Sequence, residues 1–361
     1  MRLKTSVLII LLLVTFSFAS DLGIYEKVIE NSTTPPDQIA EQLAASFKTS
    51  DLTFLNKIEV VTPNLVCKDS EKHSDFRAFL ILVTCPSFDS LLVNYGNRYA
   101  ANWILRVGVY QDQNGSQVQI ANPEAMTRII CNDLPDGDYK ILVDAAIKVK
   151  QKLRNTIIAA VEGNAVTTQM PPVRSDERIR KAKKDMIMMV GPMTFFKNRN
   201  QFPILNEVQV GDDASVTFNK VLAEVEQNIR NFKPAENDID YHWCQNPETN
   251  LQWQIVCTVK SPERNAAVIG ITRGRTEALS FHICGMNRDS EANPVPGIDH
   301  VAAYPIEVVV FEEEGKIKVG TTREMFRMDM FFWDAGKMAF MKYMKMPKTL
   351  DKSIKKAVTG H

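Results

Sequence analysis

Two stretches of the chain, "VYQDQNGSQVQIANPEAMTRI" at residues 109–129 and "VFEEEGKIKVGTTREMFRM" at residues 310–328, share one pattern of apolar and polar residues. In each, an apolar run ends, a polar segment containing a glycine follows, and apolar residues then alternate with polar ones. This pattern predicts two strands joined by a tight turn, with one face of the hairpin buried. We therefore expect one structural unit to occur twice in the chain.

The elements around the two hairpins also follow the same order. Met126 and Arg128 correspond to Met325 and Arg327 after the hairpins. Helical patterns precede and follow both hairpins, at residues 35–47 and 139–161 in one half and at residues 214–232 and 335–358 in the other. With several expected antiparallel strands in each half, the sequence predicts an α+β fold with two similar domains, each an antiparallel sheet with packed helices.

The expected boundary between the domains lies at "GNAVTTQMPPVRS", residues 163–175, where hydrophobic periodicity lapses and two prolines occur. We predict a first α+β domain over residues 20–165, a linker with a connecting helix over residues 166–204, and a second domain over residues 205–361. The chain of 361 residues is long enough for two domains of ordinary size.

Residues 94–126, "NYGNRYAANWILRVGVYQDQNGSQVQIANPEAM", and residues 304–320, "YPIEVVVFEEEGKIKVG", carry a family resemblance. They are similar to the bacterial and archaeal family called domain of unknown function 302 (DUF302). The resemblance implies a compact α+β domain in which a strand leads through an acidic, glycine-ended hairpin into a closing helix. It implies no reaction and no catalytic residues.

The first residues, "MRLKTSVLIILLLVTFSFAS", place Arg2 and Lys4 before an apolar run, with small residues near Ala19. This arrangement predicts a signal peptide over residues 1–19 and a periplasmic or secreted mature protein. No later segment approaches the length of a transmembrane helix. Loss of Arg2 and Lys4 changes 43 basic against 43 acidic residues to 41 against 43, a balance that argues against a nucleic-acid partner.

Six cysteines in an exported chain point to disulfides, because secreted compartments are oxidising. We predict the pairs Cys67 with Cys85 and Cys244 with Cys257, which would cross-link neighbouring strands at matching places in the two halves. The remaining cysteines, Cys131 and Cys284, are expected to form either one bridge between the domains or two buried thiols.

The segments "HWC" and "HIC" each place a histidine two residues before a cysteine in an expected strand, where such residues share a face. If these strands are neighbours, they would form a zinc or copper site from His242, Cys244, His282 and Cys284. A disulfide at Cys244 would remove one ligand, for which His300 could substitute. The alternative is that these are ordinary structural residues without a metal.

Methionine and lysine concentrate near the end of the chain. Seven methionines lie within residues 325–346 and four more within residues 186–193, and thioethers are ligands for Cu(I). However, the helical spacing of Met338, Met341 and Met344 favours packing. The lysine-rich stretch from residue 337 to residue 356 would attract anionic lipid or an acidic partner, although a solvated helix face explains it better.

The chain contains no nucleophile elbow, zinc-protease motif, phosphate-binding glycine loop or dinucleotide fingerprint. The leading hypothesis is therefore an exported binding module for a small molecule or a protein partner, with a groove between the halves as the expected site. One alternative is a periplasmic protein that handles copper or zinc. The other is an enzyme without a recognisable motif, which we consider less favoured than binding.

Overall fold

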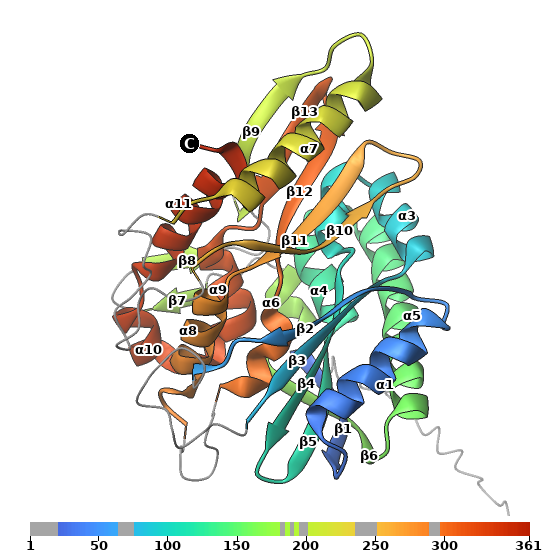
Figure 1. Ribbon diagram of the computed structural model, residues 1–361, viewed down its shortest axis with the longest axis vertical. Helices are drawn as coiled ribbons and strands as arrows, with labels where there is room; N and C mark the ends of the chain where they lie inside the picture. The colour runs from blue at the N-terminus through green and yellow to red at the C-terminus, as the bar shows by residue number, and fades with distance from the viewer. Residues whose placement is uncertain are drawn as a thin grey trace, which may run out of the picture.

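The computed structural model describes residues 21–63, 76–180, 185–187, 191–194, 201–234, 251–288 and 297–361. The expected signal peptide at residues 1–19 lies outside these ranges. Helices pack against two main antiparallel sheets (Figure 1), which confirms the predicted α+β class.

The first half forms a six-stranded sheet in the order β2-β3-β4-β5-β1-β6. Helices α1 and α5 cover one face of this sheet (Figure 1). Its elements are β1 (Leu22–Ser32), α1 (Pro36–Lys48), β2 (Thr53–Val60), β3 (Ala78–Thr84), α3 (Pro86–Asn94), the 3₁₀ helix η2 (Asn97–Asn102), β4 (Leu105–Asp112), β5 (Gly115–Ala121), α4 (Pro123–Ile130), α5 (Asp136–Ala160) and β6 (Asn164–Arg174).

The second half forms a five-stranded sheet in the order β10-β11-β12-β13-β9, and α7 and α11 pack together over it. Its elements are β9 (Ile204–Gln209), α7 (Ala214–Asn231), β10 (Gln254–Lys260), β11 (Ala266–Thr272), α8 (Gly274–Gly285), η5 (Ile298–Ala303), β12 (Ile306–Glu313), β13 (Lys316–Thr321), α9 (Glu324–Phe332), η6 (Trp333–Ala335), α10 (Gly336–Lys342) and α11 (Met346–Thr359). Between the halves lie α6 (Asp176–Arg180) and a small hairpin, β7 (Asp185–Ile187) with β8 (Gly191–Thr194).

Without β6, the strand order of the first sheet corresponds strand by strand to that of the second. In the central hairpins, Val107 pairs with Ile120 and Val308 pairs with Thr321, so both partners are shifted by 201 positions. We call residues related by this shift equivalent. The register corrects the sequence alignment by two residues, because Met126 is equivalent to Arg327 and not to Met325.

Both predicted hairpins are present, as β4 with β5 and as β12 with β13. The first closing helix is the continuous α5, whereas the second is divided into α10 and α11. Pro347 lies in the first turn of α11. Proline is tolerated there because the first turn has no intrahelical acceptor for its missing N–H, but it cannot continue a preceding helix.

The predicted linker is wrong over most of its first part, because residues Asn164–Arg174 form strand β6 and pair with β1. The strand lies at the sheet edge, where Pro171 and Pro172 need not donate to a neighbour. At its end, the Arg174 guanidinium donates to the backbone oxygen of Met330 at 3.2 Å. The first domain therefore extends beyond residue 165, and its last strand contacts the second half.

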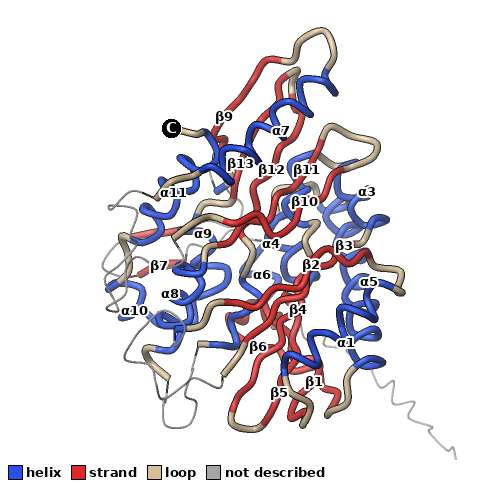
Figure 2. The backbone as a smooth tube through the Cα atoms, viewed as in Figure 1, coloured by secondary structure: helices blue, strands red, loops and turns tan. Residues whose placement is uncertain are grey.

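The two halves exchange their 3₁₀ helices. Helix η2 of the first half packs on β11 and β12, and η5 of the second half packs on β3 and β4. Edge strands β2 and β10 meet near the middle of the molecule (Figure 2), where Asn56 Nδ2 donates to the Val256 oxygen at 2.7 Å. Buried apolar residues of both halves consequently form one continuous core.

An ion pair of equivalent residues, Arg106 and Glu307, lies in this core. Their side chains are 2% and 4% exposed. Arg106 also donates to the backbone oxygens of Ile104 and Pro305, each at 3.2 Å. Arg327 donates to Glu307 Oε2 at 3.3 Å. These contacts provide the partners that buried charges require.

Within the described ranges, no helix combines the length and the apolar character needed to cross a bilayer.

Candidate functional site

A pocket of about 240 Å³ lies between the two halves. Helix η2 and the segment after α4 provide one side, and β9, β12, β13 and the residues beside them provide the other. Its apolar walls include Ile130, Phe202, Ile204, Val309 and Phe311. We call this space the interdomain pocket. Its position matches the groove expected from the sequence.

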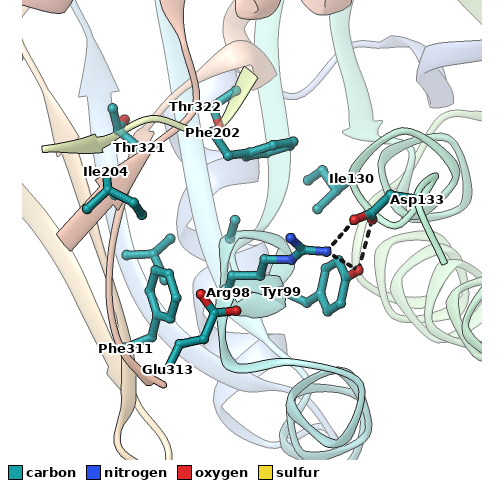
Figure 3. Close-up of a pocket in the computed structure, with 13 residues that line it drawn as sticks. Arg98, Tyr99, Ile130, Asp133, Phe202, Ile204, Phe311, Glu313, Thr321 and Thr322 are labelled. Carbon is teal, nitrogen blue, oxygen red and sulfur yellow. Dashed lines mark hydrogen bonds and ion pairs between the residues drawn. The ribbon is translucent and has the colours of Figure 1, made fainter. Parts of the chain in front are cut away.

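Arg98 is the charged group held most firmly in this pocket. Its Nη2 donates to the Tyr99 hydroxyl at 2.8 Å and forms an ion pair with Asp133. The Tyr99 hydroxyl in turn donates to Asp133 Oδ1 at 2.9 Å (Figure 3). The guanidinium also lies 4.8 Å from the centre of the Tyr99 ring. Two hydrogen-bonded partners and one aromatic ring thus fix the position of Arg98.

The free donors of Arg98 face the pocket side. Within the described residues, its Nη1 and Nε have no hydrogen-bond partner. Figure 3 shows the second terminal nitrogen directed away from Asp133, on the side where Phe202 and Ile130 enclose the space. Burial opposes the charged form, but Tyr99 and Asp133 outweigh it and raise the pKa of Arg98. The pocket therefore contains a permanent cation with unused donors.

The opposite rim carries Glu313, whose carboxylate accepts a hydrogen bond from Lys318 Nζ at 2.9 Å. The Glu313 side chain is 41% exposed and that of Lys318 is 11% exposed. Because Lys318 also contacts Glu314 at 3.0 Å, its one positive charge is shared between two carboxylates, and the charge of Glu313 is offset only in part.

Gly320 on β13 leaves room for the pocket. A Cβ atom at this position would lie 3.4 Å from Ile204 Cδ1 and 3.8 Å from Phe311 Cε1, and both of those side chains line the pocket. A longer side chain at residue 320 would therefore extend into the space.

The equivalent place in the other half is filled by charged side chains, and we call it the closed site. Its histidine, His300, is equivalent to Tyr99, and Asp334 is equivalent to Asp133. His300 Nε2 lies 3.0 Å from Asp334 Oδ1, and His300 Nδ1 lies 2.9 Å from Asp299 Oδ1. Arg288 donates to Asp299 at 2.6 Å and to Asp334 at 2.7 Å.

Larger side chains fill the remaining room in the closed site. Gln119 is equivalent to Gly320, and its Nε2 donates to the backbone oxygen of Asp299. The Tyr25 ring meets the His300 ring edge-on, with their centres 5.4 Å apart. The Phe332 ring stacks on the His300 ring, with their centres 5.7 Å apart. His300 is therefore only 1% exposed.

The closed site balances its own charges. Burial opposes the imidazolium, but Cys284, Asp299 and Asp334 outweigh it and raise the pKa of His300 well above its usual range. Burial opposes the ionised form of Asp299 as well, yet His300 and Arg288 lower its pKa to about 2. Two cations thus face two carboxylates, an arrangement suited to holding elements together rather than to binding a ligand.

A second repeated feature lies where a strand passes into a helix. In helix α3, the Asp89 carboxylate accepts a hydrogen bond from Thr84, the last residue of β3. In helix α8, the Glu277 carboxylate accepts one from Thr272, the last residue of β11. Burial raises the pKa of Asp89 to about 8 and that of Glu277 to about 7. Glu277 also accepts the Val61 N–H at 2.8 Å. Neither acid lines the interdomain pocket, although Glu277 lines a separate pocket beside β2 and β10.

The proposed metal ligands do not lie as expected. His282 and Cys284 are on helix α8 and not on a strand, so residues two apart do not share a face. His282 Nε2 lies 3.1 Å from the Tyr343 hydroxyl, whereas Cys284 contacts His300. His242 and Cys244 lie outside the described residues, which leaves the complete tetrad untested. Among the described residues, no group of three or more His, Cys, Asp or Glu side chains is arranged to hold a metal.

The predicted disulfides each include a cysteine outside the described residues, Cys67 or Cys244, so both pairs stay predictions. Their expected matching positions are wrong. Cys257 lies in β10, which corresponds to β2, whereas Cys85 follows β3. Cys131 and Cys284 are buried thiols that are not bonded to each other. Burial raises the pKa of the Cys284 thiol, which disfavours the reactive thiolate.

The methionines divide into two groups. The prediction that Met338, Met341 and Met344 pack in the core is wrong, because these side chains are 70%, 37% and 39% exposed, whereas Met328, Met330 and Met346 are buried. The lysines of α11 are exposed, while its other face buries apolar residues. This arrangement is that of a solvated helix face.

Sequence reasoning did not identify Arg98, Tyr99, Asp133 or Gly320 as site residues. A signal was present in the equivalent positions, because Asp133 and Asp334 each follow a short helix after the hairpin. Only the correct shift of 201 residues would have aligned them.

Comparison with protein-family models and with curated proteins finds no match. Among solved structures, the chain is similar to a conserved uncharacterised DUF302 protein from Bacillus stearothermophilus. The identity is 15%, the match covers 38% of this chain and 98% of that chain, and the TM-score is 0.29.

Proposed function

We propose that this protein binds a small molecule in the interdomain pocket. One observation supports this proposal above all. The interdomain pocket is open and contains a fixed cation, whereas the equivalent place in the other half, the closed site, is filled by side chains. An apolar cavity with a few fixed polar groups is the usual form of a small-molecule site.

Two further proposals accompany this function. The matching element order and hairpin register support a tandem pair of domains related to DUF302. The sequence of residues 1–19 supports export, so that the ligand would be met in the periplasm or outside the cell.

The test uses a substitution that the protein itself suggests. Gly320→Gln places in the pocket the residue found at the equivalent position of the closed site. Gly137→Gln is the matched control, because a Cβ at Gly137 meets no atom within 4 Å. The mature proteins would be screened against small molecules by thermal unfolding.

We expect at least one compound to stabilise the wild type and the Gly137→Gln control but not Gly320→Gln. A ligand at about 100 times its Kd adds about 2.7 kcal/mol to the free energy of unfolding. Equal stabilisation of all three proteins would place the binding elsewhere and contradict the proposal.

A further inference from the structure

We infer, on the basis of the proposed function, that the ligand is a small carboxylic acid in its anionic form, with an apolar body about the size of one ring. The carboxylate would meet Arg98, and the body would occupy the space between the apolar walls. Three features of the pocket support this ligand: its hydrogen-bond donor, its volume and its charge.

The donor is Arg98. Its Nη2 is held by Tyr99 and Asp133, so the guanidinium need not be ordered when a ligand arrives. Its Nη1 has no partner among the described residues and lies toward the pocket (Figure 3). An arginine in this state favours an oxygen acceptor, and a charged acceptor gains roughly twice as much as a neutral one.

The size of the space limits the body of the ligand. The pocket volume of about 240 Å³ exceeds the ~150 Å³ of a cavity that accommodates benzene. It is smaller than most sites for drug-sized ligands, which begin at roughly 300 Å³. One ring or a branched chain with a short arm fits, and the walls formed by Phe202, Ile204 and Phe311 favour an apolar body.

The charge balance selects a monoanion. The lining holds one cation, Arg98, and two carboxylates, Asp133 and Glu313. A doubly charged phosphate would face both carboxylates with a single guanidinium to offset them. An ammonium group would find Asp133 paired with Arg98 and Glu313 paired with Lys318. A single carboxylate therefore fits the unused donors best.

The test measures the preference for a head group on one constant body. Four probes share a phenyl ring: phenylacetate, the neutral phenylacetamide, the cationic phenethylamine and the zwitterion phenylalanine. Each would be titrated calorimetrically into the mature wild type, Gly137→Gln, Gly320→Gln, Arg98→Gln and Arg98→Lys.

We expect phenylacetate to bind the wild type and Gly137→Gln at least about tenfold more tightly than phenylacetamide, since a charged hydrogen bond is lost in the amide. Arg98→Gln should reduce this preference to within about twofold, and Arg98→Lys should retain part of it because the cation remains. The ratio within the wild type provides the test even if an Arg98 variant does not fold.

The failure of this inference differs from the failure of the proposed function. If the amide, the amine or the zwitterion binds as tightly as phenylacetate and Gly320→Gln abolishes that binding, the pocket binds ligands but the inferred carboxylate is wrong. If no probe binds at millimolar concentration, or if Gly320→Gln binds as the wild type does, the proposed pocket itself is contradicted.

Discussion

The interdomain pocket and the closed site retain the same hydrogen bond at equivalent positions. In one, Tyr99 contacts Asp133, and in the other, His300 contacts Asp334. The aspartate holds a residue of the exchanged 3₁₀ helix in both places. The sites differ in their surroundings, because Gly320 leaves space where Gln119 fills it. The comparison supports the proposal that one place binds a ligand while the other joins the halves.

The largest expected effect is the loss of the closed site's charge balance. Asp334→Asn removes a carboxylate that pairs with both His300 and Arg288, and we expect a loss of about 3–5 kcal/mol in the free energy of unfolding. The matched change, Asp133→Asn, should cost only about 1–2 kcal/mol because its ion pair is partly exposed. Urea unfolding of both variants measures the difference. Equal losses would remove the distinction between the two sites.

A smaller loss is expected when the closed site is opened. Gln119→Gly removes a buried side chain and its hydrogen bond to the Asp299 oxygen. It also places glycine within a strand, so we expect a loss of about 2–3 kcal/mol. Urea unfolding again provides the measurement. An unchanged stability would show that Gln119 does not hold the closed site together.

The third prediction concerns pH. The folded pKa of His300 is raised above its usual value of about 6.5, so its stabilisation is fully present below about pH 6.5 and is lost as pH rises toward the folded pKa. His300 should contribute at most about 1.4 kcal/mol per pH unit, in addition to the slope that the raised pKa values of Asp89 and Glu277 produce below about pH 8. Burial raises the pKa of Tyr99, which remains neutral over this range. Unfolding of the wild type and His300→Gln between about pH 6 and pH 9 measures the slope. An equally steep slope in His300→Gln would show that another group causes the pH dependence.

The smallest expected effect is a gain. Gly320→Gln replaces a strand glycine, which lowers the conformational entropy of the unfolded chain, and we expect about 0.5–1 kcal/mol of added stability. Its close neighbours, Ile204 and Pro203, lie at 3.4 Å from the new Cβ and limit this gain. Thermal unfolding without ligand provides the measurement. A marked loss would show that residue 320 must be glycine for folding and not for binding.

The central hairpins were predictable because alternation of apolar and polar residues indicates a strand. The expectation of one buried face was wrong, because every residue of β5 after Gly115 and of β13 after Lys316 is buried. Helix α8 was mistaken for a strand because almost every residue on it is buried, which leaves no polar side to show helical periodicity. Strand β6 was mistaken for a linker because it is mostly exposed and contains prolines that an edge strand tolerates.

The location of the candidate site between the halves followed from the expected pair of domains. The residues of the site could not be predicted in the same way, because Arg98 and Asp133 belong to the first half and Gly320 belongs to the second. The exchange of η2 and η5 brings them together, and no local pattern in the sequence records that exchange.

Arg106 and Glu307 are equivalent residues that contact each other. In a symmetric dimer of either half alone, the residue nearest the axis would meet its own copy. Arginine would then face arginine, or glutamate would face glutamate, in an interior where like charges repel strongly. Each half is thus a poor partner for itself and a good one for the half to which it is covalently joined. Fusion into one chain permits opposite charges to pair at these two equivalent positions, which a two-fold symmetric dimer of either half could not do on its axis.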